Sequence, residues 1–120
     1  ARTMEERRMK NSPLKDAAGM IRSFHYASYS ALFKQRARGL PLTEKLADAW
    51  YGFVAGTYLN VYIGEIGKIP GLVSKNRKEL EKLLKTFLWE KAIYELGYEL
   101  NNRPDWLVIP VSAINQLLRQ

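Results

Sequence analysis

The chain has 120 residues, 47% of them hydrophobic and 26% charged, as expected for one soluble globular domain or one lobe of a larger protein. It has no cysteine and a single histidine, which excludes disulfides and thiolate metal sites and leaves a zinc site without clustered ligands. No apolar run is long enough to span a membrane, and no apolar segment follows the basic N-terminus, so we expect a cytoplasmic protein with no membrane partner.

The net charge of +7 is concentrated in the N-terminal third of the chain. Residues 1–38 hold nine Lys or Arg against three Asp or Glu, whereas residues 39–120 hold ten against nine. A basic segment attracts nucleic acid, acidic lipid or a phosphate-bearing ligand, and composition does not choose among these partners.

The basic residues of this third lie in two groups. One is the run 7–10, inside a segment 1–12 that we expect to be an exposed strap, and the other is Lys34, Arg36 and Arg38. Neither group has the context of a known nucleic-acid-binding motif. We therefore expect a solvated face, or a contact with another part of the protein, rather than a nucleic-acid site.

Hydrophobic spacing and helix start and stop signals predict four helices and no sheet. Their predicted ranges are 13–38, 43–64, 75–100 and 110–120. The sequence contains no internal repeat and no low-complexity tract. The fold class that we expect is all-α.

The first predicted helix has the clearest start. Ser12 is suited to the N-cap and Pro13 to the first helical position, and Asp16 places a carboxylate in the first turn, where it favours the helix dipole. The helix is apolar around most of its girth, which predicts burial on several sides. Arg22 lies on this apolar helix and should therefore pair with a carboxylate or bind an anion.

The second predicted helix starts at the cap Thr43. We expect one packing seam along it and a close helix contact at Gly52 and Gly56. Gly64 is expected to end it. The residues of the expected seam are Trp50, Val54, Tyr58 and Val61.

The third predicted helix is the longest, roughly 39 Å at 1.5 Å per residue. Ser74 is its expected N-cap, and Asn101-Asn102 an expected left-handed C-cap before Pro104. Residues 107–109 are expected to form a short extended crossing. Pro110 then opens the last helix.

The most informative cluster spans residues 91–106. Its helical part presents Lys91, Tyr94, Glu95 and Tyr98 on one face, because they are spaced at i, i+3, i+4 and i+7. The flat rings of tyrosine and tryptophan suit stacking under a pyranose, and carboxylates, carboxamides and guanidinium groups can bind neighbouring hydroxyls. The polar residues that follow along the chain are Glu99, Asn101, Asn102, Arg103, Asp105 and Trp106.

Each residue of this cluster also has an ordinary structural interpretation. Lys91 and Glu95 fit an exposed i,i+4 ion pair, and an asparagine fits a helix cap. Trp106 fits a core position. Spacing alone favours these interpretations over ligand binding.

No residue of the chain offers the machinery of catalysis. His25 has no metal-ligand partner at suitable spacing, and the chain lacks a glycine-rich phosphate loop, a kinase catalytic loop and a metal-binding Asp-Phe-Gly motif. We therefore expect no catalytic and no metal-binding residue in the chain.

Two segments resemble the maltokinases, which occur free-standing or fused to trehalose synthase. EERRMKNSPLKDAAGMIRSFHYAS, residues 5–28, is similar to the segment that follows that family's magnesium-binding Asp-Phe-Glu-Gly-Glu-Pro motif. KAIYELGYELNNRPDWLVIP, residues 91–110, resembles its C-terminal signature. The match between them, over residues 39–79, is loose. His25 departs from the family, whose Arg-Ser-Phe-Asp-Tyr pattern has aspartate there.

The resemblance implies a phosphotransferase that transfers phosphate from ATP to maltose, giving maltose 1-phosphate for glycogen and related α-glucans. It implies the helical part of the C-lobe of an aminoglycoside-phosphotransferase or protein-kinase-like fold. The residues that bind ATP and Mg²⁺ would lie mainly upstream, so this part alone would be inactive. The residues expected at the acceptor sugar are Tyr94, Tyr98, Glu99, Asn101, Arg103 and Trp106, supported by Asp16, Arg22, Lys91 and Glu95.

The implied partners are maltose, the N-lobe with the catalytic segment, and a trehalose synthase domain where one is fused. Two other classes of function stay open at this point. The first is a non-catalytic basic helical module that binds nucleic acid. The second is a helical bundle that hides its surplus apolar faces in a homodimer.

Overall fold

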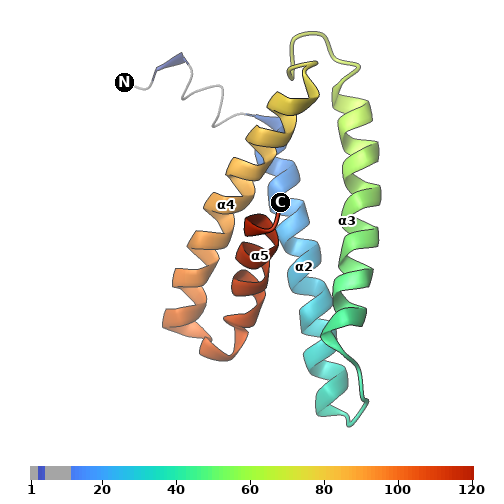
Figure 1. Cartoon of the computed structure of the whole chain (residues 1–120), viewed down its shortest axis with the longest axis vertical. Coiled ribbons are helices and arrows are strands. Elements are labelled where there is room, and N and C mark those ends of the chain that lie inside the picture. The colour runs from blue at the N-terminus through green and yellow to red at the C-terminus, as the bar shows by residue number, and fades with distance from the viewer. Residues whose placement is uncertain (1–2, 5–11) are drawn as a thin grey trace.

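The computed structural model describes residues 3–4 and 12–120, and the chain within this part is all-α (Figure 1). Four α-helices and one short 3-10 helix follow one another, with no strand among the described residues. No helix in this part of the chain is both long and apolar enough to cross a membrane. The elements are α2 (Pro13–Ala37), α3 (Glu44–Ile66), α4 (Arg77–Asn102), η1 (Pro104–Trp106) and α5 (Val108–Leu118).

Helix α2 lies in the middle of the bundle, with α3 on one side of it and α4 on the other (Figure 1). Helices α2 and α4 run in the same direction, and α3 and α5 run in the opposite one. Helix α5 packs back against α4 after the turn formed by η1. The predicted burial of the first helix on several sides is confirmed, because α2 contacts all three of the other long elements.

The starts of the first two long helices are confirmed. The side chain of Ser12 accepts a hydrogen bond from the backbone N–H of Leu14 at 3.2 Å. Thr43 does the same for Leu46 at 3.3 Å. These caps satisfy backbone donors that have no partner inside the helix.

The predicted start of the third helix was two residues too early. Asn76, not Ser74, is the N-cap, because its side-chain oxygen accepts from the backbone N–H groups of Lys78 and Glu79. The Ser74 hydroxyl instead donates to the Glu79 carboxylate at 2.5 Å. Asparagine and serine cap almost equally well, so the sequence offered two candidates and the backbone path chose between them.

The predicted chain path after the third helix was also wrong. Asn101 and Asn102 continue α4, and no non-glycine residue in the described part has a positive φ. Residues 107–109 are not extended, because α5 already begins at Val108. Pro110 thus lies in the first helical turn, where its missing N–H costs nothing.

Smaller differences concern the ends of the first two long helices. Helix α2 ends at Ala37 rather than 38, before Gly39 turns the chain with φ +84°. Helix α3 continues past Gly64 to Ile66. One glycine costs about 1 kcal/mol in a helix interior. That is too little to end α3 at Gly64, because Ile66 beyond it is buried in the core.

The expected seam of α3 was partly wrong. Trp50 and Val61 are exposed by 47% and 62%, while Ala47 and Ala55 are buried against α2. The expected close helix contact at the two glycines is absent as well: nothing lies within 4 Å of where a Cβ would stand at Gly52 or Gly56. The helix therefore turns two alanines and its tyrosines toward α2, while Trp50 and Phe53 face outward. Its two half-buried seam residues are Val54 and Tyr58.

The hydrophobic core consists of two clusters at different levels of α2. The upper one, near the α3–α4 connection, contains Leu14, Ala18, Ile66 and Phe87. The lower one contains Tyr29, Leu32, Ala47 and Ile109, with Tyr26, Phe33, Leu42, Trp106 and Val108 packed on it.

Removing the central side chain of the upper cluster should destabilise the fold strongly. Phe87 is only 3% exposed, and we expect Phe87→Ala to lower the free energy of unfolding by about 3–5 kcal/mol, since it loses apolar burial and leaves a cavity. Urea unfolding followed by circular dichroism measures this. Leu100→Ala is the matched control on α4: it is 60% exposed, and its effect should stay within about 0.5 kcal/mol.

Candidate functional site

The C-terminal half of α4 presents the tyrosines expected at a sugar site. Tyr94 and Tyr98 are exposed by 73% and 48%, and they lie one helical turn apart on one face. Asn101 and Asn102 are exposed at the end of the same helix. Two solvent-facing aromatic rings beside carboxamides form a surface that is suited to a polyol.

Glu99 is the buried anchor of this region. Its carboxylate is 0% exposed and accepts hydrogen bonds at 2.9 Å from both Nε and Nη2 of Arg103. The hydroxyl of Tyr26, from α2, donates to the same carboxylate at 2.8 Å. Burial alone would raise the pKa of Glu99, but the bonds from Arg103 and Tyr26 outweigh it and lower that pKa, so Glu99 is a carboxylate at neutral pH.

Arg103 connects the buried carboxylate to the surface. Its guanidinium lies 4.1 Å from the centre of the Trp106 ring and 5.8 Å from that of Tyr98. Its side chain is 44% exposed, and Glu99 uses only two of its five N–H groups. The two bonds to Glu99 thus fix the orientation of the guanidinium, while its other N–H groups remain able to donate to a ligand beside the Tyr98 ring.

Trp106 is held on several sides by other groups. Its ring stacks on Tyr26 at a centroid distance of 6.2 Å and meets Phe33 edge-on at 5.5 Å. With Arg103 over the same ring, Trp106 is half-buried in the lower cluster. Trp106 therefore occupies a core position, as its structural interpretation predicted. The aromatic rings that face solvent are those of Tyr94 and Tyr98.

A second polar contact joins α2 to α4 one turn away. Arg22, only 3% exposed, donates from Nε to the Glu95 carboxylate at 2.7 Å. The expected pairing of Arg22 with a carboxylate is confirmed. Within the described residues Glu95 does not form the exposed ion pair with Lys91, because its carboxylate faces α2 and pairs with Arg22. The Lys91 side chain lies over Gly19 instead.

His25 completes this contact from within α2. Its ring is fully buried, and its Nδ1 lies 2.6 Å from Nη1 of Arg22. An arginine can only donate, so Nδ1 accepts and the ring proton resides on Nε2. Burial first, and the charge of Arg22 second, lower the pKa of His25 to about 3, so the ring is neutral at physiological pH.

The Arg22–His25 pair retains two buried polar atoms, Arg22 Nη2 and His25 Nε2, without a hydrogen-bond partner in the described structure. The His25 ring packs between two others: it lies 4.6 Å from the Tyr51 ring of α3 and edge-on to Tyr29 at 5.1 Å. A histidine fits this space, but unlike an aspartate it brings no negative charge to Arg22.

The structure brings most of the expected site residues together. Tyr98, Glu99, Arg103 and Trp106 form one connected group at the lower end of α4, and Tyr94 lies one turn earlier on the same helix. Asp16 stands apart, exposed in the first turn of α2.

Sequence analysis missed two side chains of this network. Tyr26 was not among the predicted site residues, and His25 was noted only as a histidine without metal-ligand partners. The spacing could have revealed both, since Arg22, His25 and Tyr26 are three and four residues apart and share a face of α2.

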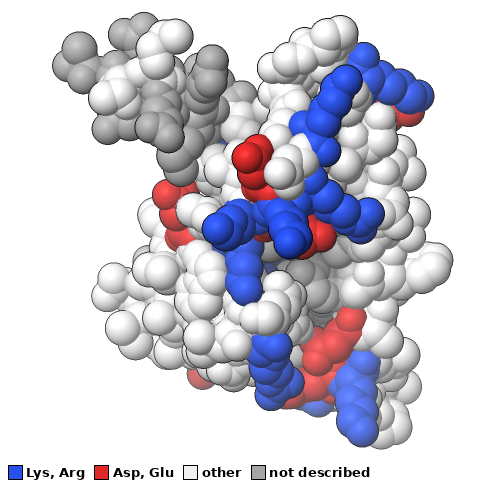
Figure 2. Space-filling view, turned by 45° about the horizontal axis from the view of Figure 1, so that its top comes forward, with Lys and Arg blue, Asp and Glu red and all other residues white. Residues whose placement is uncertain are grey.

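The described residues contain no group of three or more His, Asp or Glu that could hold a metal ion. On the face seen in Figure 2, lysines and arginines lie beside aspartates and glutamates and do not form an unbroken basic surface. Lys34 and Arg36 lie in the last turn of α2, where Arg36 donates to the backbone oxygen of Leu42. The predicted strap 1–12 with its basic run 7–10 lies almost wholly outside the described residues.

No family model matches the chain, and no solved structure matches it significantly.

Removing the carboxylate of the Arg22–Glu95 pair should be costly. In Glu95→Gln the guanidinium of Arg22 stays buried without a countercharge, and we expect the free energy of unfolding to fall by about 3–5 kcal/mol. Urea unfolding at neutral pH measures the loss. Glu90→Gln, an exposed carboxylate on the same helix, should change it by less than about 0.5 kcal/mol, and equal effects of the two variants would contradict the role of the pair.

Stability should also depend on pH through His25. Its pKa in the folded state, about 3, lies below the ordinary histidine pKa of about 6.5. Between these two pH values the unfolded chain binds a proton at His25 and the folded chain does not. We expect the free energy of unfolding to decrease by up to about 1.4 kcal/mol per pH unit as the pH falls from 6.5 toward 5.

The control for this pH dependence is His25→Asn, whose side chain does not titrate. Its unfolding free energy should vary less over the same pH range, whatever its absolute stability. Glu95 has the opposite effect on the pH dependence of stability. Burial chiefly raises its pKa, so the folded state binds a proton there more readily than the unfolded state, and this contribution to the free energy of unfolding grows as the pH falls. A wild-type profile as flat as that of His25→Asn would refute the neutral buried ring.

Proposed function

We propose that this chain is the C-terminal helical portion of a maltokinase and that the exposed end of α4 contacts the acceptor sugar. ATP and Mg²⁺ would be bound by the upstream part of the parent enzyme, so the chain alone would not transfer phosphate. The proposal rests on two long segments, 5–28 and 91–110, that resemble this family in the same order. The all-α architecture is compatible with the helical part of a kinase-like C-lobe.

The observation that carries the sugar role is the arrangement around Tyr98. Its half-exposed ring lies beside the Arg103 guanidinium, whose direction is fixed by the buried carboxylate of Glu99. A pyranose on the ring would meet the remaining N–H groups of Arg103, so one sugar could use an apolar face and paired hydroxyl contacts together. A loose arginine would lose more conformational entropy on binding.

The other expected residues take supporting places in this proposal. Tyr94 extends the aromatic surface by one turn, and Asn101 offers an exposed carboxamide. Trp106 orients Arg103 by stacking under its guanidinium. The Arg22–Glu95 pair keeps α4 in register with α2, so it acts on the site only through the helix that it holds.

The test uses the intact enzyme that contains this chain together with its catalytic part. Tyr98→Ala should raise the KM for maltose roughly tenfold, because a stacking contact with substrate is lost, while kcat and the KM for ATP stay unchanged. Steady-state kinetics with each substrate varied separately measure this. Thr86→Ala, exposed three turns earlier on α4, is the control and should leave all constants as they are.

Unchanged maltose KM values in both Tyr94→Ala and Tyr98→Ala would remove α4 from the acceptor site. The family proposal has its own test in the coding sequence upstream of Ala1. An Asp-Phe-Glu motif in that sequence supports it, and an initiator methionine immediately before Ala1 contradicts it.

A further inference from the structure

The connection between α3 and α4 exposes two aliphatic side chains at one end of the bundle (Figure 1). The backbone N–H of Leu72 donates to the oxygen of Ile69 at 3.3 Å, and between them lie Pro70 and Gly71, which has φ +74°. Proline followed by a glycine of positive φ fits a type II turn, which brings its first and fourth Cα atoms within about 7 Å. Ile69 and Leu72, exposed by 53% and 41%, therefore lie close together. Val73 packs on the upper cluster and holds the turn on the bundle.

Basic side chains flank this turn on both sides. Residues 67–78, here called the tip, include Lys68, Lys75, Arg77 and Lys78 and no aspartate or glutamate. Within the described residues, the side chains of Lys75 and Lys78 make no hydrogen bond or ion pair. Lys68 and Arg77 pair only with exposed carboxylates one turn away, and exposed pairs contribute little. The tip thus carries positive charge on both sides of an apolar centre.

We propose that the tip docks the protein on an anionic lipid surface. Ile69 and Leu72 enter the boundary between headgroups and acyl chains, while the basic side chains contact the headgroups around them. Each lysine or arginine near such a surface strengthens binding roughly fivefold. Aliphatic side chains that leave water on contact strengthen it further. The inference is independent of the proposed sugar role, which uses the other end of α4.

A surface contact is compatible with a chain whose described part has no membrane-spanning helix. The expectation of no membrane partner considered spanning segments and the apolar part of a signal peptide. A surface contact needs neither, because it places only side chains in the interfacial layer.

The composition of the tip favours lipid over nucleic acid. Single-stranded nucleic acid is bound largely by stacking its bases on aromatic rings, and residues 63–86 include no aromatic residue. Two neighbouring aliphatic side chains between basic ones match a bilayer instead, since its charged headgroups lie directly above its apolar chains.

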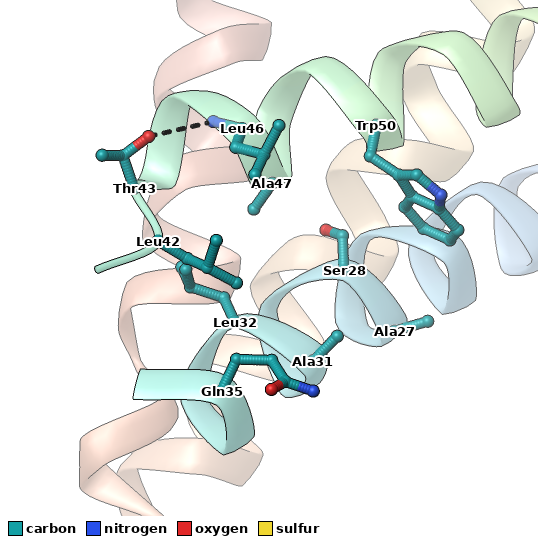
Figure 3. A pocket seen from close by; sticks show the side chains of 10 residues that line it. All are labelled: Ala27, Ser28, Ala31, Leu32, Gln35, Leu42, Thr43, Leu46, Ala47 and Trp50. Carbon is teal, nitrogen blue, oxygen red and sulfur yellow. Dashed lines mark hydrogen bonds between the residues drawn. The ribbon is translucent and has the colours of Figure 1, made fainter. Parts of the chain in front are cut away.

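The tip is also separate from the pocket that could hold a small ligand. That pocket lies toward the opposite end of the bundle, between α2 and the start of α3 (Figure 3). None of the residues that line it belongs to the tip. Apolar side chains on a turn at the end of the bundle suit an extended partner surface, such as that of a bilayer.

The test is co-sedimentation of the whole chain with unilamellar vesicles of phosphatidylcholine, with or without one third phosphatidylserine. We expect binding to the vesicles with phosphatidylserine that weakens as salt is raised, and little binding to phosphatidylcholine alone. Lys75→Ala combined with Lys78→Ala should weaken this binding roughly twenty-five-fold. Ile69→Ser combined with Leu72→Ser should weaken it at least about tenfold, because the apolar contact is lost.

Lys34→Ala combined with Lys45→Ala is the matched control. It removes two exposed charges near the other end of the bundle and should leave vesicle binding unchanged. Urea unfolding should show that all these variants of exposed residues keep nearly the stability of the wild type.

Two results would overturn the proposal. One is wild-type binding that does not depend on phosphatidylserine, or that either pair of tip substitutions leaves unchanged. The other is duplex DNA that binds as tightly as the vesicles at the same salt and does not require Ile69 and Leu72, which would assign the basic side chains to nucleic acid.

Discussion

The ion pair between Arg22 of α2 and Glu95 of α4 sets the register on which the rest of the bundle depends. Arg22 and Glu95 are 73 residues apart, and the hydrogen bond from Tyr26 to Glu99 spans the same 73. Two parallel helices keep a constant offset because both rise by the same 1.5 Å per residue. A slip of one residue would take Glu95 away from Arg22 and Glu99 away from the Tyr26 hydroxyl, and it would leave the Arg22 guanidinium buried without a countercharge. Apolar contacts alone are less directional and would resist such a slip less strongly.

This polar layer also divides the hydrophobic core. Above it the upper cluster joins Leu14 to Phe87, again at an offset of 73, and below it the lower cluster gathers around Tyr29. The polar layer also orients side chains at the surface. Glu99 holds the guanidinium of Arg103 by two hydrogen bonds, and that guanidinium lies against the rings of Trp106 and Tyr98. The surface that we propose for the sugar is therefore positioned from the core, whereas α3 is held chiefly by α2.

Much of the local structure follows from short-range chemistry. The caps at Ser12 and Thr43 were predicted because a hydroxyl there satisfies backbone donors within the same turn. The start of α4 and the path after it were missed, because Asn76 and Ser74 compete as caps and Pro110 is compatible with either the first position or the first turn of a helix. The expected seam of α3 failed for another reason: periodicity identifies an apolar face, but it does not say whether this chain covers that face.

The sequence by itself determined the all-α class, the four helices and the need of Arg22 for a carboxylate, since spacing, capping and the cost of a buried charge are properties of residues near one another in the chain. It also placed Tyr94 and Tyr98 on one face of a helix. Only the tertiary structure decided that Glu95 is the partner of Arg22, that His25 is buried and neutral, and that Trp106 packs inside while the tyrosines face outward. These outcomes depend on which helix lies beside which, and that contact is made across 73 residues of chain.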